Sequence, residues 1–227
     1  MAIFEPAPYV PPTGLEAMVR MAYLEPVALL AETSSALLLV DVQNRFLYHG
    51  SEDKPAPTAS VVEPIERLLG SARSQDVPCV YVTGGHAPGG MADAAPWLWR
   101  LAVMGADVTA RLRGPVDEWQ AAIPASIAPR AGEVHLTKWR YSAFYETGLE
   151  MLLRGGGIET VVIGGVASYG CIIATYIDAA CRGFFPLICT EAVDGADPTL
   201  HRAAMDFMAS RSMINVDDVI RIWSEQV

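Results

Sequence analysis

The chain has 227 residues, of which 52% are hydrophobic and 19% are charged, so it can fill the core of one domain and is not intrinsically disordered. Its formal net charge is −10, which argues against a nucleic-acid or anionic-membrane partner. No apolar run approaches the roughly 20 residues that span a bilayer, the start does not resemble a signal peptide, and the four cysteines form no CxxC pair, so we expect reduced thiols and a cytoplasmic protein.

The first 34 residues differ from the rest and are expected to form an N-terminal arm, followed by one domain over residues 35–227. Four prolines between residues 6 and 12 impose an extended start. Thr13 can then cap a helix with an apolar face. That face needs a cover, which can be its own domain or a neighbouring subunit, and we therefore predict a homodimer or homotetramer. The residues of this face are Leu15, Met18, Val19, Ala22 and Tyr23.

From residue 35 onward, short apolar runs typical of buried strands alternate with stretches of helical periodicity. This alternation predicts an α/β fold with a mostly parallel sheet of about six strands and helices on both faces. The expected strands cover residues 36–41, 77–83, 134–136, 160–164, 185–190 and 212–216, and the expected helices lie near residues 61–69, 149–154, 171–182 and 198–210.

The segment 84–133 interrupts this alternation. It is long and rich in glycine, proline and tryptophan. Long insertions on a rigid α/β scaffold often form lids or binding loops. The alternative is a surface excursion that contains a short helix or two.

Ligands bind at the carboxyl ends of the strands in an open parallel sheet, so the polar residues that end the apolar runs are the candidates for chemistry. Asp41 ends the first run, Thr83 and His86 follow the second, Lys138 follows the third, and Cys171 comes after a glycine-rich turn that follows the fourth. An acid, an amine and a thiol at neighbouring strand ends can serve as general base, cation and nucleophile. Taken singly, the acid and the amine could equally be a helix cap or a surface ion pair.

Cys171 carries the strongest local signal, because it opens a predicted helix. The positive end of a helix macrodipole would lower the pKa of a thiol there, and free backbone N–H groups could hold an oxyanion. The alternative is a small buried hydrophobe, the common fate of a free cysteine. We interpret the other three cysteines in that second way: Cys79, Cys181 and Cys189.

Three motifs in chain order resemble those of the isochorismatase-like cysteine hydrolases. Leu39–Phe46 is similar to their D-x-Q-x-x-F opening, and Thr137–Phe144 is similar to their K-x-x-x-S-A-F segment. Gly164–Thr175 resembles the G-V-x-[TS]-x-x-C nucleophile turn, and Asp178–Phe184 extends the match. The resemblance covers roughly residues 35–220 and leaves the arm outside.

This resemblance implies a three-layer α/β sandwich and a catalytic triad of Asp41, Lys138 and Cys171. It also implies a cis peptide between Val166 and Ala167, with an oxyanion hole made by the N–H groups of Ala167 and Cys171. The implied reaction is hydrolysis of a small amide, carbamoyl or ureido compound through a thioester on Cys171. The cysteine argues against isochorismate chemistry, and the Gly170-Cys171 pair looks most like the N-carbamoylsarcosine amidase and maleamate amidohydrolase branch.

Other functions remain open at this stage. A nicotinamidase-like amidase would place a metal on one Asp and two His after the second strand, but this sequence offers only His86 with Asp93 nearby, too few ligands for a protein metal site, so we expect no metal and no other cofactor. A catalytically silent binding protein of the same fold is a second alternative, and thiol redox chemistry a third, which lacks a CxxC partner. The residues expected to contact substrate are Phe46, His86, Trp97, Trp99, Tyr141 and Tyr169.

Overall fold

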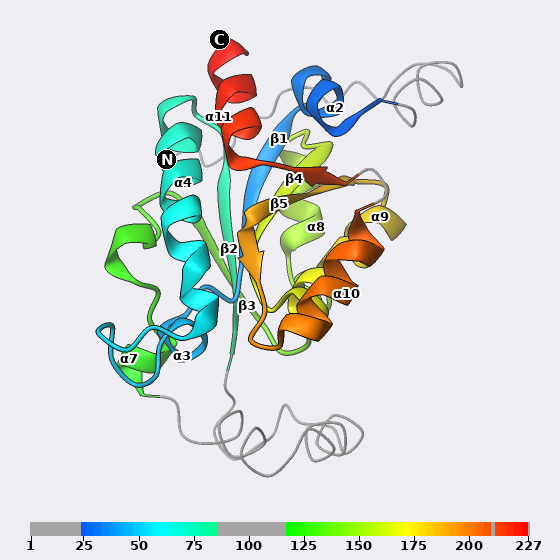
Figure 1. Ribbon diagram of the computed structural model, residues 1–227. Coiled ribbons are helices and arrows are strands. Elements are labelled where there is room, and N and C mark those ends of the chain that lie inside the picture. Colours follow the sequence, from blue (N-terminus) through cyan, green and yellow to red (C-terminus); the bar gives the residue numbers. More distant parts are fainter. Residues whose placement is uncertain (1–23, 86–116, 210–211, 227) are drawn as a thin grey trace.

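The computed structural model describes residues 24–85, 117–209 and 212–226, and a six-stranded sheet lies at its centre (Figure 1). The strand order is β3-β2-β1-β4-β5-β6, and each neighbouring pair is parallel. The predicted α/β class is therefore confirmed, and so are all six predicted strands. The strands are β1 (Ser35–Val40), β2 (Cys79–Gly84), β3 (Val134–Lys138), β4 (Thr160–Val166), β5 (Phe185–Asp194) and β6 (Met213–Ile214).

The central strands are buried on both faces, as their continuous apolar sequences predict. Every residue of β1 is buried. Because successive side chains of a strand point to opposite faces, Leu37 and Leu39 enter one core cluster, whereas Leu38 and Val40 enter the other. Two cores require a layer of helices on each side of the sheet, which gives a three-layer sandwich.

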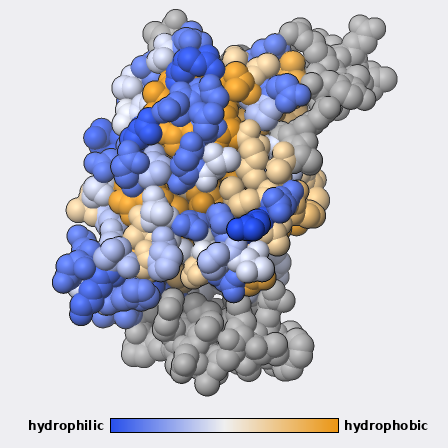
Figure 2. All heavy atoms as spheres, viewed as in Figure 1, coloured by the Kyte–Doolittle hydropathy of each residue, from blue (hydrophilic) through white to orange (hydrophobic). Residues whose placement is uncertain are grey.

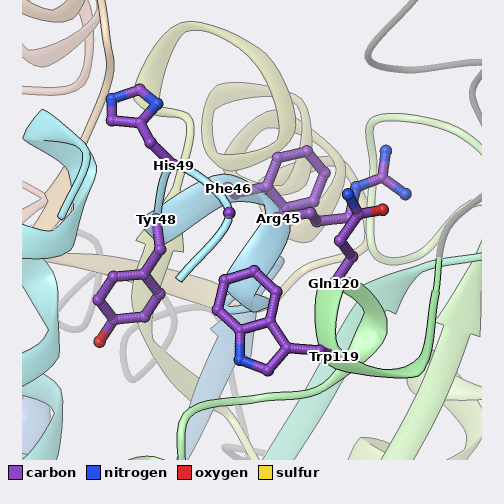
Figure 3. Close-up of a pocket in the computed structure, with 7 residues that line it drawn as sticks. Arg45, Phe46, Tyr48, His49, Trp119 and Gln120 are labelled. Carbon is purple, nitrogen blue, oxygen red and sulfur yellow. The ribbon is translucent and has the colours of Figure 1, made fainter. Parts of the chain in front are cut away.

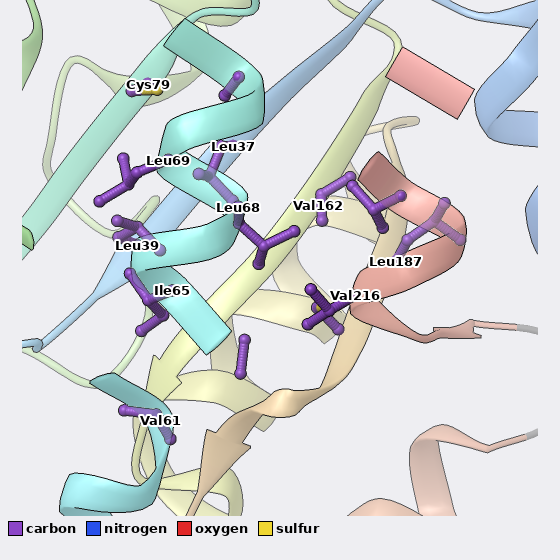
Figure 4. Close-up of a cluster of buried hydrophobic side chains, with 14 of the residues drawn as sticks. Leu37, Leu39, Val61, Ile65, Leu68, Leu69, Cys79, Val162, Leu187 and Val216 are labelled. Atoms are coloured by element: carbon purple, nitrogen blue, oxygen red, sulfur yellow. The ribbon is translucent and has the colours of Figure 1, made fainter. Parts of the chain in front are cut away.

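One face is covered by α2 (Pro26–Glu32), η1 (Pro57–Val61), α4 (Val62–Ser74) and α11 (Val216–Glu225). Ile65, Leu68 and Leu69 of α4 pack on Leu37 and Leu39 of the sheet (Figure 4). The outward sides of α4 and α11 are hydrophilic, with apolar residues visible between the two helices (Figure 2). This division is what an amphipathic surface helix produces.

The opposite face is covered by α8 (Leu149–Gly155), α9 (Ile173–Cys181) and α10 (Pro198–Met208). All three were expected from helical periodicity. The turn before α9 is a short π-helical segment, η4 (Ser168–Ile172), so the predicted helix over 171–182 begins inside an irregular turn. The described chain is completed by two short helices and a 3₁₀ turn on the α4 side of the sheet. They are α3 (Asn44–Leu47), α7 (Glu118–Ala121) and η3 (Ala125–Ile127).

Of the described α-helices that the sequence patterns did not predict, α11 and α2 are the longest. In α11, Asn215 caps the first turn by accepting from the backbone N–H of Asp218, and the apolar residues that follow have helical spacing. The indole N–H of Trp223 donates to the Ser35 hydroxyl at 2.9 Å, which fixes this last helix to the start of β1. The buried apolar residues of α11 are Val216, Val219, Ile222 and Trp223.

The second missed helix, α2, lies within the segment assigned to the arm. Its Leu29 and Leu30 are buried in the core beside α11. Residues 1–23, including the helix expected after Thr13, lie outside the described residues. The boundary between an arm of residues 1–34 and a domain of residues 35–227 stays a prediction.

Of the three cysteines that were expected to be buried, one is exposed. Cys79 and Cys189 are buried, as predicted, but Cys181 is exposed, so that interpretation was wrong. The buried residues of α9 are Thr175 and Ala179, which share one face four residues apart. Cys181 follows Ala179 by two residues, about 200° around a helix of 3.6 residues per turn, and therefore faces outward.

Among the residues that the structure describes, no helix is long and apolar enough to cross a membrane.

The strand order places a topological switch point between β1 and β4, because the chain winds outward from β1 in one direction and from β4 in the other. Ligand sites of open α/β sheets form at such points, beyond the carboxyl ends of the strands. Gly165 lets β4 pass close to β1 there: it has φ +122°, and a Cβ at this position would lie 2.0 Å from the carbonyl oxygen of Val40. The close approach of the two strands thus explains why position 165 is a glycine.

Candidate active site

Asp41 is the first residue after β1 and is 2% exposed. Its backbone N–H donates to the carbonyl of Val82 at 3.0 Å, so it is held by the end of the neighbouring strand. Its φ of 56° is in the left-handed region, which a residue with a Cβ seldom occupies. Such conformations concentrate at functional sites, where the surrounding structure enforces them.

Lys138 is the last residue of β3, on the far side of β2 from β1, and is 3% exposed. Its Nζ lies 2.7 Å from Oδ2 of Asp41 and 3.2 Å from Sγ of Cys171, and it donates to the carbonyl of Arg140 at 3.1 Å. These three acceptors match the three hydrogens of an ammonium group. The buried cation is therefore fully hydrogen-bonded and sits between the acid and the thiol.

β2 ends in a glycine, which leaves room for Lys138 to contact Asp41. Gly84 pairs with Lys138 in the sheet register. A Cβ at Gly84 would lie 3.3 Å from Oδ1 of Asp41, tighter than most contacts of this kind. A larger residue at position 84 would press on the carboxylate, so this glycine is part of the site although sequence reasoning treated it only as loop composition.

Cys171 lies in η4, after the turn that follows β4. The peptide bond between Val166 and Ala167 is cis. The carbonyl of Ala167 accepts from the backbone N–H groups of Gly170 at 3.0 Å and Ile172 at 3.3 Å, which closes the turn beneath the thiol. The structure thus brings Asp41, Lys138 and Cys171 together from three separate strand ends.

The pKa of Cys171 differs from the expectation. Burial raises the pKa of this thiol above its ordinary value, the negative charge of Asp41 raises it further, and Lys138 opposes both without reversing them. The prediction that the helix terminus lowers this pKa was wrong, because the cost of removing a thiolate from water exceeds the local attraction. The direction of this shift favours the protonated thiol at neutral pH.

Lys138 and Asp41 form a buried ion pair beside the thiol. Burial alone would lower the pKa of Lys138, but the negative charge of Asp41 and the hydrogen bonds to Asp41 and Cys171 outweigh it and raise the pKa above the ordinary lysine value. The cation is therefore retained at neutral pH. Oδ1 of Asp41 is buried and has no hydrogen-bond partner among the described residues. A buried carboxylate oxygen without a partner can accept a proton from a neighbouring group.

The K-x-x-x-S-A-F segment and the nucleophile helix are joined through Thr175, which is fully buried. Its hydroxyl donates to the carbonyl of Cys171 at 2.6 Å and accepts from the backbone N–H of Ala143 at 3.0 Å. One hydroxyl therefore links the loop after Lys138 to the turn of Cys171. The motif letters alone do not reveal this connection, because Ala143 and Thr175 are 32 residues apart in the chain.

The D-x-Q-x-x-F segment has a comparable structural role. The side chain of Gln43 donates to the carbonyl of Ala121 at 3.0 Å and accepts from the backbone N–H of Gly84 at 3.1 Å. Asn44 donates from its side chain to the carbonyl of Trp119 at 2.9 Å. Two polar side chains close to Asp41 in the chain thus hold α7, a short helix within the long segment 84–133.

These contacts bring α7 against α3, and an open cavity of about 290 Å³ lies between them. Phe46 and Trp119 present aromatic surface to it, and Arg45 and Gln120 carry its polar side chains (Figure 3). Of these residues only Phe46 was predicted. The signal that could have found Trp119 is its place near the end of the tryptophan-rich segment 84–133, ahead of a predicted strand. The lining residues are Arg45, Phe46, Tyr48, His49, Gly50, Trp119 and Gln120.

The other predicted substrate residues have different positions. The Tyr141 ring lies beside Gly170, because a Cβ on that glycine would be 3.8 Å from it. Tyr169 packs against the second core cluster and against Gly195. Three predictions, together with most of the insertion that carries them, fall outside the described residues: His86, Trp97 and Trp99.

In the part of the chain that the structure describes, no three His, Cys, Asp or Glu side chains are grouped so that they could hold a metal ion. His135 of β3 is engaged instead with the hydroxyl of Thr83, at 2.8 Å, and burial lowers its pKa. His86 and Asp93 lie outside the described residues, so the expectation of a metal-free site stays a prediction.

Comparisons with known proteins agree with this geometry. Residues 35–217 match the Isochorismatase domain family. The chain is 31% identical over 206 residues to ureidoacrylate amidohydrolase RutB of Methylorubrum extorquens, covering 85% of this chain and 83% of the relative. It is 32% identical over 168 residues to maleamate amidohydrolase of Pseudomonas putida, covering 74% and 76%.

Among solved structures, a cysteine hydrolase from Pseudomonas syringae superimposes with a TM-score of 0.73 at 20% identity, covering 90% of this chain and 96% of the other. That likeness shows a shared fold. The family match spans the sheet from β1 to the start of α11 and includes Asp41, Lys138 and Cys171. The chain belongs to the isochorismatase family.

Proposed function

We propose that this protein is a cysteine-dependent amidohydrolase that cleaves a C–N bond of a small amide, carbamoyl or ureido compound through a thioester intermediate. The observation that carries the proposal is the contact of Lys138 with both Asp41 and Cys171, at 2.7 and 3.2 Å, in a buried site at the switch point of the sheet. Relatives named for hydrolysis of ureidoacrylate and maleamate support the same substrate class.

In the first half of the reaction, Sγ of Cys171 attacks the substrate carbonyl carbon while its proton passes to Oδ1 of Asp41. The carbonyl oxygen becomes an oxyanion, which the N–H groups of Ala167 and Cys171 are proposed to hold. Asp41 then gives the proton to the substrate nitrogen, the C–N bond breaks, and ammonia or an amine leaves. Lys138 remains charged throughout and stabilises whichever of its two neighbours is anionic.

In the second half, Asp41 takes a proton from water, and the oxygen of that water attacks the thioester carbonyl. The C–S bond breaks, the carboxylic acid leaves, and Asp41 returns the proton to the sulfur. The same carboxylate therefore acts as base and acid in both halves, which is why its pairing with a permanent cation matters.

The cavity beside α3 and α7 is the proposed location of the substrate's non-reacting part. The first residue that lines it, Arg45, follows Asp41 by four positions in the chain. Gln43 hydrogen-bonds both to Ala121 of α7 and to Gly84 at the carboxyl end of β2. A volume of about 290 Å³ suits a small molecule. We expect the insertion to complete this pocket, with His86, Trp97 and Trp99 as the candidates.

The direct test is a panel of primary amides, carbamoyl amino acids and ureido acids, scored by ammonia release. At least one compound should be hydrolysed, and prior alkylation of the thiols with iodoacetamide should stop the reaction. The substrate should protect one thiol, that of Cys171. A protein that binds a compound from the panel equally well before and after alkylation, with no ammonia released, would instead be the silent binding protein.

Metal removal separates the proposal from the nicotinamidase-like alternative. The hydrolysis should survive exhaustive dialysis against a strong chelator, because the mechanism draws its base, cation and nucleophile from side chains. Metal analysis of the purified protein is the accompanying measurement. A tightly bound zinc or iron ion at one equivalent, whose removal stops turnover, would contradict it.

We also propose that the protein is a homodimer or homotetramer to which the N-terminal arm contributes. The apolar positions between Leu15 and Tyr23 need a cover. Since Leu29 and Leu30 of α2 belong to the core, the truncation should remove residues 1–23 only. Light scattering should then report a smaller assembly than that of the full chain. An unchanged mass would remove the arm from the interface.

A further inference from the structure

The turn that carries Cys171 has a polar support that the mechanism does not use. Ser168, three residues before the cysteine, is fully buried. Its hydroxyl lies 3.0 Å from Nδ1 of His201, on α10. Buried hydroxyl groups are nearly always hydrogen-bonded, and here the partner comes from a helix 33 residues further along the chain.

His201 is itself held from several sides. Its backbone N–H donates to the carbonyl of Asp197 at 2.8 Å in the first turn of α10. Its Nδ1 is also 3.8 Å from Oδ1 of Asp194, at the end of β5. That carboxylate accepts from the backbone N–H of Gly195 at 2.6 Å and from the hydroxyl of Ser60 in η1. The imidazole therefore has a fixed place between the end of the sheet and the nucleophile turn.

Gly195 allows this approach. A Cβ at this position would lie 2.8 Å from Oγ of Ser168 and 2.6 Å from the ring of Tyr169, distances that real Cβ atoms essentially never show. The connection from β5 to α10 is thus packed directly against the turn, and the position admits only glycine. Two independent features therefore place the segment from Gly195 to His201 against Ser168: the hydrogen bond of His201 and the close approach of Gly195.

We propose that His201 is a positioning residue for hydrolysis: by holding the Ser168 hydroxyl it fixes the backbone of Ala167 relative to Cys171, and so sets the spacing of the oxyanion donors. Ser168 directly follows Ala167, and the carbonyl of Ala167 already accepts two hydrogen bonds within the turn. The inference rests on the proposed function, because only an acyl-transfer reaction forms an oxyanion there.

The proposal separates two reactions of the same thiol. Amide hydrolysis passes through an oxyanion and depends on donor placement, whereas alkylation by iodoacetamide displaces iodide at a saturated carbon and forms no oxyanion. His201→Ala should therefore lower kcat for the best substrate of the panel by roughly 10–100-fold. KM and the pH profile of Cys171 alkylation should stay as in the parent protein, since Asp41 and Lys138 are untouched.

Three further variants distinguish positioning from general support of α10. His201→Asn keeps a polar side-chain atom near the place of Nδ1 and should recover part of kcat. Asp197→Ala removes the helix cap, which accepts from the N–H groups of Thr199 and Leu200 at 2.9 and 3.0 Å; it should lower Tm and leave kcat unchanged. Ser168→Ala should reproduce the kcat loss, and the Ser168→Ala, His201→Ala double variant should lose no more than the larger single loss.

The outcomes are distinct. Equal falls in turnover and alkylation rate, or an unchanged kcat in His201→Ala, would overturn the positioning role while leaving the proposed function standing. If His201→Ala does not fold, Ser168→Ala carries the same comparison, and a normal kcat there would reject the inference. A parent protein that hydrolyses nothing in the panel and forms no acyl group on Cys171 would overturn the proposed function and this inference with it.

Discussion

Replacing Cys171 by alanine should reduce hydrolysis to the background rate. The thiol is the proposed nucleophile, and it lies 3.2 Å from Nζ of Lys138, which is also 2.7 Å from the proposed acid–base carboxylate of Asp41. Removing a covalent nucleophile from a site whose parts act as a unit costs on the order of 10⁶-fold in kcat. Ammonia release from the best substrate, measured against a blank without enzyme, is the readout.

A matched set of controls exists within the chain. Cys79→Ala and Cys189→Ala remove buried thiols that lie in β2 and β5, away from Asp41 and Lys138, with burial raising the pKa of each. They should lower Tm without lowering kcat. In the parent protein, a slowly deacylating substrate should leave a mass increase on the peptide of Cys171. Substantial turnover by Cys171→Ala would instead favour a mechanism in which Asp41 acts alone as an acid.

The strand ends were predictable because they follow from local sequence and one rule of architecture. A continuous apolar run such as 36–40 becomes a central strand wherever it lies in the chain. In a parallel sheet its polar terminator must then join the terminators of its neighbours at one edge. Asp41, Lys138 and Cys171 could be identified in this way, and the family motifs ordered them, although their mutual distances needed the folded chain.

What could not be predicted depends on contacts between distant segments. Nothing near Trp119 in the sequence says that Asn44 holds its carbonyl, or that the cavity lies between α3 and α7. The hydrogen bond from Trp223 to Ser35 joins residues that are 188 positions apart. The sequence around α11 therefore gives no sign that this helix packs at the start of β1. Long-range hydrogen bonds of this kind leave no periodic signal.

The pKa of Cys171 failed as a prediction for a different reason. The sequence places the thiol at a helix start, which favours thiolate, but it does not reveal how completely the neighbouring helices and strands remove water from the sulfur. Burial is a tertiary property. Once it is known, the expected starting state is a neutral thiol beside an ion pair, and the expected role of Asp41 as acceptor of the thiol proton is unchanged.

That starting state makes Asp41→Asn and Lys138→Ala a pair with opposite signatures. The charge of Asp41 raises the thiol pKa and the charge of Lys138 lowers it. Neutralising Asp41 should therefore shift iodoacetamide reactivity of Cys171 to lower pH, whereas neutralising Lys138 should shift it to higher pH. Each profile is measured as alkylation rate against pH, with Asp178→Asn, on the solvent side of α9, as the control that should shift neither way.

Turnover should fall in both variants, even though one of them ionises its thiol more readily. Asp41→Asn retains size and hydrogen bonding but can neither accept the thiol proton nor return it to the leaving nitrogen, and the loss of a general acid–base group costs ~10²–10⁴-fold. A thiolate without that acid attacks and then reverts, because an unprotonated amine is a poor leaving group. Reactive thiol and failed hydrolysis in the same variant would place Asp41 in proton transfer to nitrogen. Faster hydrolysis alongside faster alkylation would mean that thiol ionisation alone limits the reaction, and the acid role of Asp41 would have to be abandoned.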